Sequence, residues 1–266
     1  MAAENEKAIG VFDSGIGGLT VVRELIERLP GEEIVYFGDT ARLPYGTKSA
    51  DAVERFARQN LAFLQGKNVK LIVIACNTAS SVALPRLQAE EEIPVLGVLR
   101  PGARGAVEVT ENGRVAVIGT TATITSRAYE KALNEMREGL EIWTRACPLF
   151  VSLVEEGWLE DDITRQVAER YLSGLAGFGA DTLVLGCTHY PLLKGVISRV
   201  VGDRVRLVDS AFETAREVER VLDREGLRNS REKGGKITVY VSDIPYLFQQ
   251  VGERFLGRPL DRVEHI

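Results

Sequence analysis

Short apolar runs alternate with longer amphipathic stretches along the first part of the chain. Apolar runs of a few residues bounded by glycine or polar residues are typical of buried strands. In the stretches between them, apolar residues recur every three or four positions, as Val21, Val22 and Leu25 do, which is typical of a helix with one buried face. The pattern predicts strands at residues 9–12, 34–37, 71–76 and 95–98, with helices over residues 21–29, 53–64 and 80–91.

The same alternation starts again at Arg114. Strands are predicted at residues 115–118, near 142, at 182–187 and at 205–208, with helices over 127–138 and 163–175. Matching strands of the two series lie 106, 107, 111 and 110 residues apart, measured from Ile9 to Val115, Ile34 to Glu141, Cys76 to Cys187 and Val95 to Val205. This near-constant spacing indicates two related halves, and the relation lies in the pattern more than in residue identity.

Strict alternation of strands and helices predicts right-handed crossovers and parallel sheets, so the fold class is α/β. Two such halves related by a pseudo-twofold axis would face each other across a cleft. We therefore predict two pseudo-symmetric parallel-sheet α/β domains, the first formed by residues 1–99 plus 209–266 and the second by residues 100–208. The last segment, with a helix near 212–224 and a strand near 237–241, has no counterpart and is expected to pack on the first half.

Composition narrows the class of protein without identifying a reaction. The 266 residues are 45% hydrophobic, which is enough for a core, and the formal net charge is −5 with both signs mixed along the chain. A nucleic-acid partner would require a clustered basic face, so we expect a small solute and no nucleic acid. The sequence shows no secretory leader and no apolar run long enough to span a membrane, which predicts a cytoplasmic protein without membrane contact.

Two of the three cysteines stand in equivalent places. Cys76 and Cys187 each end an apolar strand run, and a small amide or hydroxyl residue follows each of them. Open α/β proteins bind ligands at the carboxyl edge of their strands, so both thiols are expected there. A single cysteine at a strand end is more often a packing residue, but two in equivalent contexts favour chemistry. Cys147, which precedes Pro148, is interpreted as structural.

A pair of facing thiols admits several chemistries. One cysteine with His189 as base would suffice for nucleophilic catalysis, but Cys76 would then have no role. Cys76, Cys187 and His189 together offer three zinc ligands, but the short ligand spacing of structural zinc sites is missing, and redox pairs more usually form a Cys-x-x-Cys motif. Proton transfer uses both thiols, because a racemase removes a proton from one face of a carbon and returns one to the other.

A thiol needs help to act as a base at neutral pH. Its ordinary pKa of roughly 8.5 leaves only a few per cent as thiolate, a deficit of roughly 2 kcal/mol. Asp13, at the first strand end, and Glu155 and His189 in the second half are the candidates to orient a thiol or to handle its proton. A carboxylate cannot lower the pKa of a thiol through its charge, so it would act as a hydrogen-bond or proton acceptor.

The glycine-rich turn after the first strand has a competing interpretation. Gly15 and Gly17 open a helix, and Asp39 ends the next strand, as in a dinucleotide site. The third glycine of that fingerprint would fall at Thr20, so the signal for a nucleotide is weak, and no Walker-type lysine motif is present. We expect neither a cofactor nor a metal.

Six short motifs occur in order along the chain. They are FDSGIGG at residues 12–18, LPYG at 43–46, ACNTA at 75–79, CPLF at 147–150, VEEG at 154–157 and LGCTHYP at 185–191. Together they resemble the motifs of the glutamate racemases, in the cofactor-independent aspartate/glutamate racemase superfamily, and the similarity covers almost the whole chain. The resemblance implies two α/β domains around a central cleft and an enzyme that interconverts L- and D-glutamate without pyridoxal phosphate, metal or nucleotide, supplying D-glutamate for peptidoglycan.

The resemblance also implies roles for individual residues. Cys76 and Cys187 would be the two catalytic acid/bases, with Cys76 acting on the D-enantiomer and assisted by Asp13. Cys187 would act on the L-enantiomer, assisted by Glu155 and His189. The residues implied to contact glutamate or to line its cleft are Asp13, Ser14, Tyr45, Gly46, Asn77, Thr78, Thr120, Thr121, Thr123, Thr188 and His189.

The sequence departs from the family pattern in small ways and leaves rival functions open. Ser152 stands where a proline is expected, and Ser242-Asp243 replaces a Thr-Ser-Gly-like stretch. The alternatives are an aspartate racemase of the same superfamily, a non-catalytic two-lobed glutamate-binding protein, and a dinucleotide-dependent enzyme that uses Asp39. Family members are commonly homodimers, but no feature of this sequence selects a pairing face.

Overall fold

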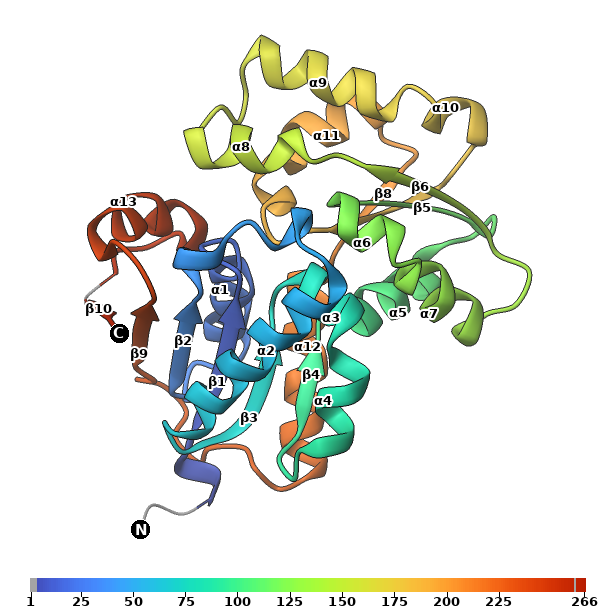
Figure 1. Cartoon of the computed structure of the whole chain (residues 1–266). Coiled ribbons are helices and arrows are strands. Elements are labelled where there is room, and N and C mark those ends of the chain that lie inside the picture. The colour runs from blue at the N-terminus through green and yellow to red at the C-terminus, as the bar shows by residue number, and fades with distance from the viewer. Residues whose placement is uncertain (1–3, 261) are drawn as a thin grey trace.

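Two parallel β-sheets organise the structure, a computed structural model that describes residues 4–260 and 262–266 (Figure 1). The predicted first domain includes residues 1–3 and 261, which lie outside the described residues. The first sheet has six strands, in the spatial order β10 (Val263–His265), β9 (Ile237–Val241), β2 (Ile34–Gly38), β1 (Ala8–Asp13), β3 (Val69–Ile74) and β4 (Val95–Gly97). The second sheet has four, in the order β6 (Glu141–Ala146), β5 (Arg114–Gly119), β7 (Thr182–Gly186) and β8 (Arg206–Asp209).

The two sheets repeat one topology. In each, the first strand of the half-chain lies between the second and the third, and the fourth pairs with the third. All pairings are parallel, with Ile9 opposite Ile34 in one sheet and Val115 opposite Ile142 in the other. The predicted fold class, two pseudo-symmetric parallel-sheet α/β units, is therefore confirmed. The extra strands β9 and β10 extend only the first sheet, because β9 pairs with β2.

Helices connect and cover the strands. Those of the first half are α1 (Leu19–Arg28), α2 (Ala50–Gln65), α3 (Asn77–Val82) and α4 (Leu84–Glu90), with short 3-10 turns at Glu4–Glu6, Thr40–Arg42 and Tyr45–Thr47. The second half contains α5 (Leu99–Val109), α6 (Thr121–Thr125), α7 (Ala128–Met136), α8 (Leu149–Glu156), α9 (Asp162–Leu172), α10 (Leu175–Phe178) and α11 (Lys194–Val201), with a 3-10 turn at Tyr190–Leu193. The last two helices are α12 (Ser210–Arg224) and α13 (Pro245–Leu256).

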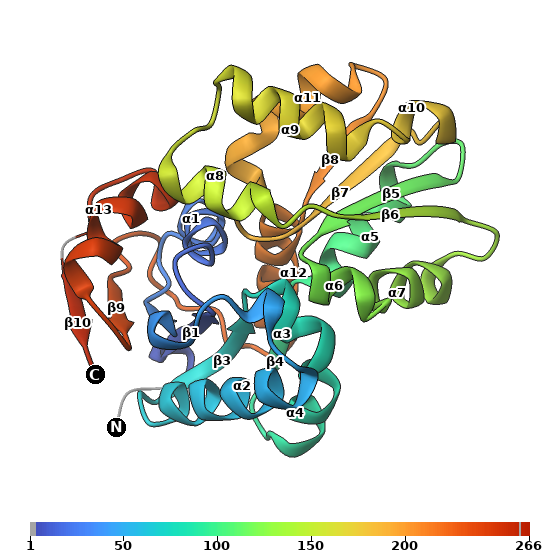
Figure 2. The same cartoon turned by 45° about the horizontal axis from the view of Figure 1, so that its top comes forward.

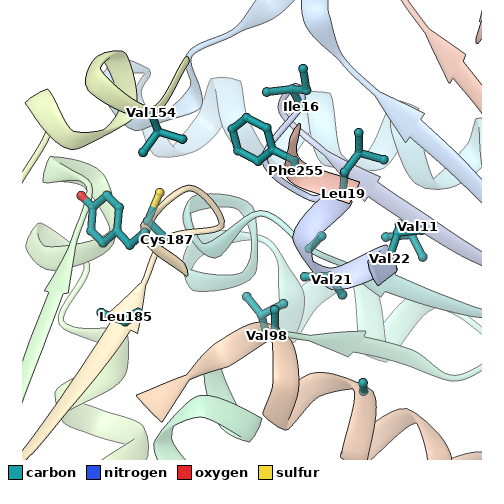
Figure 3. Close-up of a cluster of buried hydrophobic side chains, with 14 of the residues drawn as sticks. Val11, Ile16, Leu19, Val21, Val22, Val98, Val154, Leu185, Cys187 and Phe255 are labelled. Atoms are coloured by element: carbon teal, nitrogen blue, oxygen red, sulfur yellow. The ribbon is translucent and has the colours of Figure 1, made fainter. Parts of the chain in front are cut away.

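Both faces of each sheet are buried, as expected for parallel strands connected by helices. On β1, Ile9 and Val11 join one hydrophobic cluster while Phe12 joins another on the opposite face. The first of these clusters runs from one half of the molecule into the other (Figure 3), where Val11 and Leu19 of the first half and Leu185 of the second all contribute to it. Helix α12 packs against both α1 and α5, so it ties the two sheets together (Figure 2).

Helix α5 is the clearest departure from the predicted elements. Residues 99–109 contain Pro101, Gly102 and Gly105, which lower helix propensity, and no helix was expected there. Tertiary packing explains the glycines. A Cβ on Gly102 would lie 3.2 Å from the Tyr129 hydroxyl, and one on Gly105 would lie 2.7 Å from the side chain of Glu213. Both glycines therefore let α5 approach its neighbours closely.

Other boundaries also differ from the pattern. The helix expected over residues 80–91 begins at Asn77 and divides near Ala83 into α3 and α4. Helices α8 and α13 and the edge strand β10 were not predicted, because short apolar runs do not distinguish a strand from a buried helix. The early start of α3 matters for function, since it places Asn77 and Thr78 directly after Cys76 at the first turn of a helix.

Candidate active site

The carboxyl ends of the inner strands of both sheets converge on one cavity of about 600 Å³. Cys76 follows β3 and Cys187 follows β7, and both cysteines line this cavity although each is almost completely buried. Twelve of the predicted residues line it: Ser14, Tyr45, Gly46, Cys76, Asn77, Thr78, Thr120, Thr121, Glu155, Cys187, Thr188 and His189. Asp13 and Thr123 do not, because each lies behind a lining residue.

On the first side of the cavity, the neighbours of Cys76 are the Ser14 hydroxyl and the Asp13 carboxyl group. The Cys76 thiol donates to the Ser14 hydroxyl across 3.7 Å. Asp13, 1% exposed, accepts from the backbone N–H groups of Gly18 at 2.9 Å and Gly15 at 3.3 Å through Oδ2. Its Oδ1 has no hydrogen-bond partner among the described residues. Asp13 is therefore held by the turn and keeps one oxygen unsatisfied.

Burial controls the protonation of this side. It raises the pKa of the Asp13 carboxyl above its ordinary value, with the charge of His189 and the backbone N–H groups acting in the opposite direction. Burial also raises the pKa of the Cys76 thiol to about 12, and the negative charge of Asp13 adds to the rise. Cys76 is consequently a thiol at neutral pH and can donate a proton.

On the second side, the Cys187 thiol contacts the His189 imidazole, which in turn contacts the Glu155 carboxylate. The Cys187 sulfur lies 3.9 Å from His189 Nδ1, and His189 Nε2 lies 2.9 Å from Glu155 Oε1. Burial by itself lowers the pKa of His189, but the hydrogen bonds and charges of Cys187 and Glu155 outweigh it and raise the pKa to about 10. His189 therefore carries a proton at neutral pH and presents it to the sulfur.

The glycine-rich turn after β1 allows this arrangement because Gly17 and Gly18 have no side chains. A Cβ on Gly17 would lie 2.2 Å from Thr188 Oγ1 and 2.5 Å from His189 Nδ1, and one on Gly18 would lie 2.6 Å from the Asp13 Cβ. All three distances are too short for any side chain. Gly17 is required because the first half approaches the histidine of the second half this closely, and Gly18 is required because the turn packs against Asp13, which accounts for both glycines without a nucleotide.

Polar groups from both halves meet at the far wall of the cavity. Tyr129 donates to Asn77 Oδ1 at 2.7 Å, which fixes the orientation of the Asn77 amide and of its nitrogen. That nitrogen is buried and has no partner among the described residues. The hydroxyls of Thr78, Thr120 and Thr123 form a triangle with sides of 2.9, 3.0 and 3.4 Å. Donors and acceptors for a polar ligand are thus concentrated on one wall.

Tyr45 contributes its ring and backbone to the cavity while its hydroxyl faces the protein. The hydroxyl donates to Asp39 Oδ2 and accepts from Asn60 Nδ2 at 3.0 Å. Burial and the Asp39 charge raise the pKa of Tyr45, so the phenol stays protonated. Gly46 approaches the opposite half, since a Cβ there would lie 3.0 Å from Thr120 Cβ.

The carboxylate of Asp39 is fully engaged inside the protein. Arg42 Nε donates to its Oδ1 at 2.8 Å, and the Ser242 hydroxyl donates to the same oxygen at 3.1 Å while accepting from Ala41 N at 3.0 Å. With Tyr45 on Oδ2, neither oxygen is left for the ribose of a dinucleotide. Ser242, one of the departures from the family pattern, therefore fastens the loop that carries Tyr45.

Sequence reasoning missed three groups at this site. Tyr129, Asp39 as a partner of Tyr45, and the apolar lining from α8 each depend on contacts between segments far apart in the chain. Only the lining had a local signal, because Pro148 and Leu149 belong to a recognised motif. Among residues 4–260 and 262–266, no three His, Cys, Asp or Glu side chains are grouped as metal ligands, and every helix is too short or too polar to cross a membrane.

Comparisons with known proteins agree with this geometry. A family model described as Asp/Glu/Hydantoin racemase matches residues 9–218. A glutamate racemase of Geobacter metallireducens is 54% identical over 98% of this chain and 96% of that protein, and one of Neisseria meningitidis is 50% identical over 98% and 97%. Crystal structures of glutamate racemases from Bacillus anthracis and from Francisella tularensis, the latter in complex with D-glutamate, are each 40% identical, with TM-scores of 0.95 and 0.92 and 98% of both chains covered. The chain belongs to the Asp/Glu/Hydantoin racemase family.

Proposed function

We propose that this protein interconverts L- and D-glutamate by moving a proton between two thiols on opposite sides of the α-carbon. The observation that carries the proposal is that Cys76 and Cys187, which end equivalent strands of two matching sheets, line one cavity. The product D-glutamate would supply peptidoglycan synthesis. We expect the enzyme to work in the cytoplasm.

The transfer from L- to D-glutamate needs one thiolate and one thiol. The Cys187 thiolate takes the α-proton, so an S–H bond forms while the electron pair of the C–H bond stays on the α-carbon. The Cys76 thiol then gives its proton to the opposite face of that carbon and becomes the thiolate. The reverse reaction starts from Cys76, and no other redox or covalent change is needed.

The electrostatics of the two sides suit these roles. The raised pKa of Cys76 keeps its proton in place until a carbanion forms next to it. The protonated His189, oriented by Glu155, stands beside Cys187 and favours the charged form of that sulfur. When Cys76 must in turn be the base, Asp13 is the nearest group able to act as a hydrogen-bond or proton acceptor.

Substrate binding would use the polar wall of the cavity. The unpartnered Asn77 amide is suited to a carboxylate oxygen of glutamate, because ligand binding would satisfy a donor that is otherwise buried without a partner. The hydroxyls of Thr78, Thr120 and Thr121 would contact the rest of the polar groups. A relative that is 54% identical to this chain is a glutamate racemase, which favours glutamate over aspartate as the substrate.

Deuterium incorporation tests the proposal. Purified protein, treated with a chelator and kept in reductant, is incubated with L-glutamate in deuterated water, and the D-glutamate formed is analysed by mass spectrometry. We expect D-glutamate that carries deuterium on the α-carbon. L-aspartate under the same conditions tests the closest rival substrate, and Cys147→Ser is the control for a thiol outside the cavity. Absence of racemisation, or turnover of aspartate in place of glutamate, would reject the proposed function.

A further inference from the structure

Helix α13 belongs to the segment that has no counterpart in the second half, yet its last turn contacts the catalytic apparatus of that half. The helix packs on α1 and leads into β10 at the edge of the first sheet. Its C-terminal end lies beside α8 (Figure 2), the helix that carries Glu155. The contact is made by two consecutive residues, Arg254 and Phe255.

Arg254 binds the end of α8. Its guanidinium donates to the carbonyl oxygen of Val154 at 3.2 Å and to that of Glu155 at 3.3 Å. The last carbonyls of a helix have no partner within the helix, and a cation near them is favourable. Gly157 makes room for this contact, because it adopts a φ of 81° and a Cβ there would lie 2.8 Å from the guanidinium. Arg254 therefore fixes the backbone from which Glu155 projects.

Phe255 packs against His189, the hydrogen-bond partner of Glu155. Its side chain is fully buried, and its ring meets the His189 ring edge to face, at a centroid distance of 5.1 Å and an angle of 81°. Figure 3 shows Phe255 next to Ile16 and Leu19 of the first half. The imidazole ring thus packs against a helix of the first half, while its Nε2 lies within hydrogen-bond distance of Glu155.

The Cys76 side is supported differently. Of its neighbours, Asp13 ends β1 and Ser14 follows it, in the same half of the molecule as Cys76 itself. We propose that Arg254 and Phe255 are positioning residues for the His189–Glu155 pair, and that through it α13 controls proton transfer at Cys187 and not at Cys76. The inference rests on the proposed function, in which the two thiols act on opposite enantiomers.

Isotope effects separate the two proton transfers. The equilibrium constant between enantiomers is one, so kcat/KM must fall equally in both directions for any variant and cannot itself identify the affected thiol. The primary isotope effect on kcat/KM can. When abstraction by Cys187 becomes slower, the effect with α-deuterated L-glutamate rises, and the effect with α-deuterated D-glutamate falls because abstraction by Cys76 no longer limits the rate.

The main variants are Phe255→Leu and Arg254→Ala. We expect kcat/KM to fall about tenfold for the first and about threefold for the second, because small displacements of a catalytic group are costly. In both, the isotope effect should rise for L-glutamate and fall for D-glutamate. Arg254→Lys, which keeps a cation and one donor, should restore most of the loss.

Two matched controls remove similar groups elsewhere. Phe248→Leu removes another aromatic ring of α13, whose centroid lies 6.1 Å from that of the Tyr36 ring. Arg258→Ala removes an exposed arginine just beyond the end of the helix. Both should leave the two isotope effects in their wild-type ratio. If thermal unfolding shows that Phe255→Leu is not folded, Arg254→Ala decides the question, with the same expected directions of change in the isotope effects. Unchanged isotope effects, or a rise for D-glutamate, would overturn the proposal.

A second measurement keeps this test separate from that of the proposed function. If the wild-type protein does not racemise glutamate, iodoacetamide labelling of Cys187 relative to Cys76, followed by peptide mass spectrometry, replaces the kinetics. A misplaced His189 favours the Cys187 thiolate less, so the labelling ratio should fall about threefold in Phe255→Leu. It should be unchanged in Phe248→Leu, and a fall in both variants or in neither would overturn the inference.

Discussion

The two sides of the cavity share a topology and differ in chemistry. Cys76 and Cys187 follow the third strand of sheets with the same strand order. Behind Cys76 lies the buried Asp13 carboxyl with an unsatisfied oxygen, whereas next to Cys187 lies His189, which hydrogen-bonds to Glu155. The duplicated fold therefore places two thiols in equivalent positions, and the segments around them surround each thiol with different groups.

This difference shows which parts of a duplicated fold can diverge. The position of each thiol depends on strand pairing, which fixes a whole sheet and changes little. The supporting groups come from the end of β1 and the turn after it on one side, and from α8 and the segment after β7 on the other, where Arg254 and Phe255 of α13 also make contact. Four predictions test how far the two sides differ, beginning with the largest effect.

The thiols themselves should have equal weight. Cys76→Ser and Cys187→Ser should each lower racemisation by roughly 10³-fold or more in both directions, because a hydroxyl is a far weaker acid than a thiol. D-glutamate and L-glutamate formation are followed by chiral chromatography. Cys147→Ser, in which the altered residue lies outside the cavity, should retain at least half of the activity. Substantial turnover in either active-site variant would remove the need for a pair.

The supporting groups should have separable effects. His189→Asn and Asp13→Asn should each lower kcat/KM by about 10²-fold, since each removes a proton acceptor or donor beside one thiol. Their isotope effects should move in opposite directions: the effect on L-glutamate rises in His189→Asn, and the effect on D-glutamate rises in Asp13→Asn. The same direction in both variants would mean that the two groups do not serve different thiols.

Changes to the polar wall of the cavity, which includes Asn77 and its partner Tyr129, should affect substrate binding more than the chemical step. Tyr129→Phe removes the hydroxyl that orients Asn77, so the amide loses its fixed direction. We expect KM to rise about tenfold with little change in kcat, corresponding to about 1.4 kcal/mol for one hydrogen bond. Steady-state kinetics in both directions measure this split. A fall in kcat alone would assign the hydroxyl to the chemical step.

The last prediction concerns stability and pH, with no change in turnover required. Folding raises the pKa of His189 from 6.5 to about 10, so the native state binds this proton more tightly than the unfolded chain does. The stabilisation is complete below pH 6.5 and is lost as the pH rises toward 10. Discounted for the solvent around Glu155, it amounts to about 2 kcal/mol. Urea unfolding of wild type and His189→Asn at pH 6 and pH 10 should show the gap in unfolding free energy closing, and a constant gap would contradict the assignment.

Strand positions and the place of the thiols were predictable because they depend on local runs of apolar residues. The strands that lead to Cys76 and Cys187 were predicted from such runs, and their equivalence followed from constant spacing along the chain. Asp13, Glu155 and His189 were named as candidates from the sequence itself, but assigning Asp13 to Cys76 and the other two to Cys187 required the resemblance to a family, since nothing local pairs residues 155 and 189. The predicted residue roles stay predictions until the variants are measured.

What the sequence did not show depends on contacts between distant segments. Tyr129 is 52 residues from the asparagine that it orients, and Phe255 meets a histidine from the other half of the fold. Helix α5 was missed because the glycines that lower its propensity are there to allow close packing. Gly17 misled in the opposite direction, since a glycine needed for contact with His189 looks locally like one needed for a phosphate.

The contact at Gly17 makes the solvent exposure of the His189 ring depend on the width of the cleft. His189 is buried because Gly17 and Phe255 of the first half cover it. An opening of the cleft that drew this turn away would expose the ring to water. Such an opening would let the two sulfurs exchange protons with bulk solvent between turnovers.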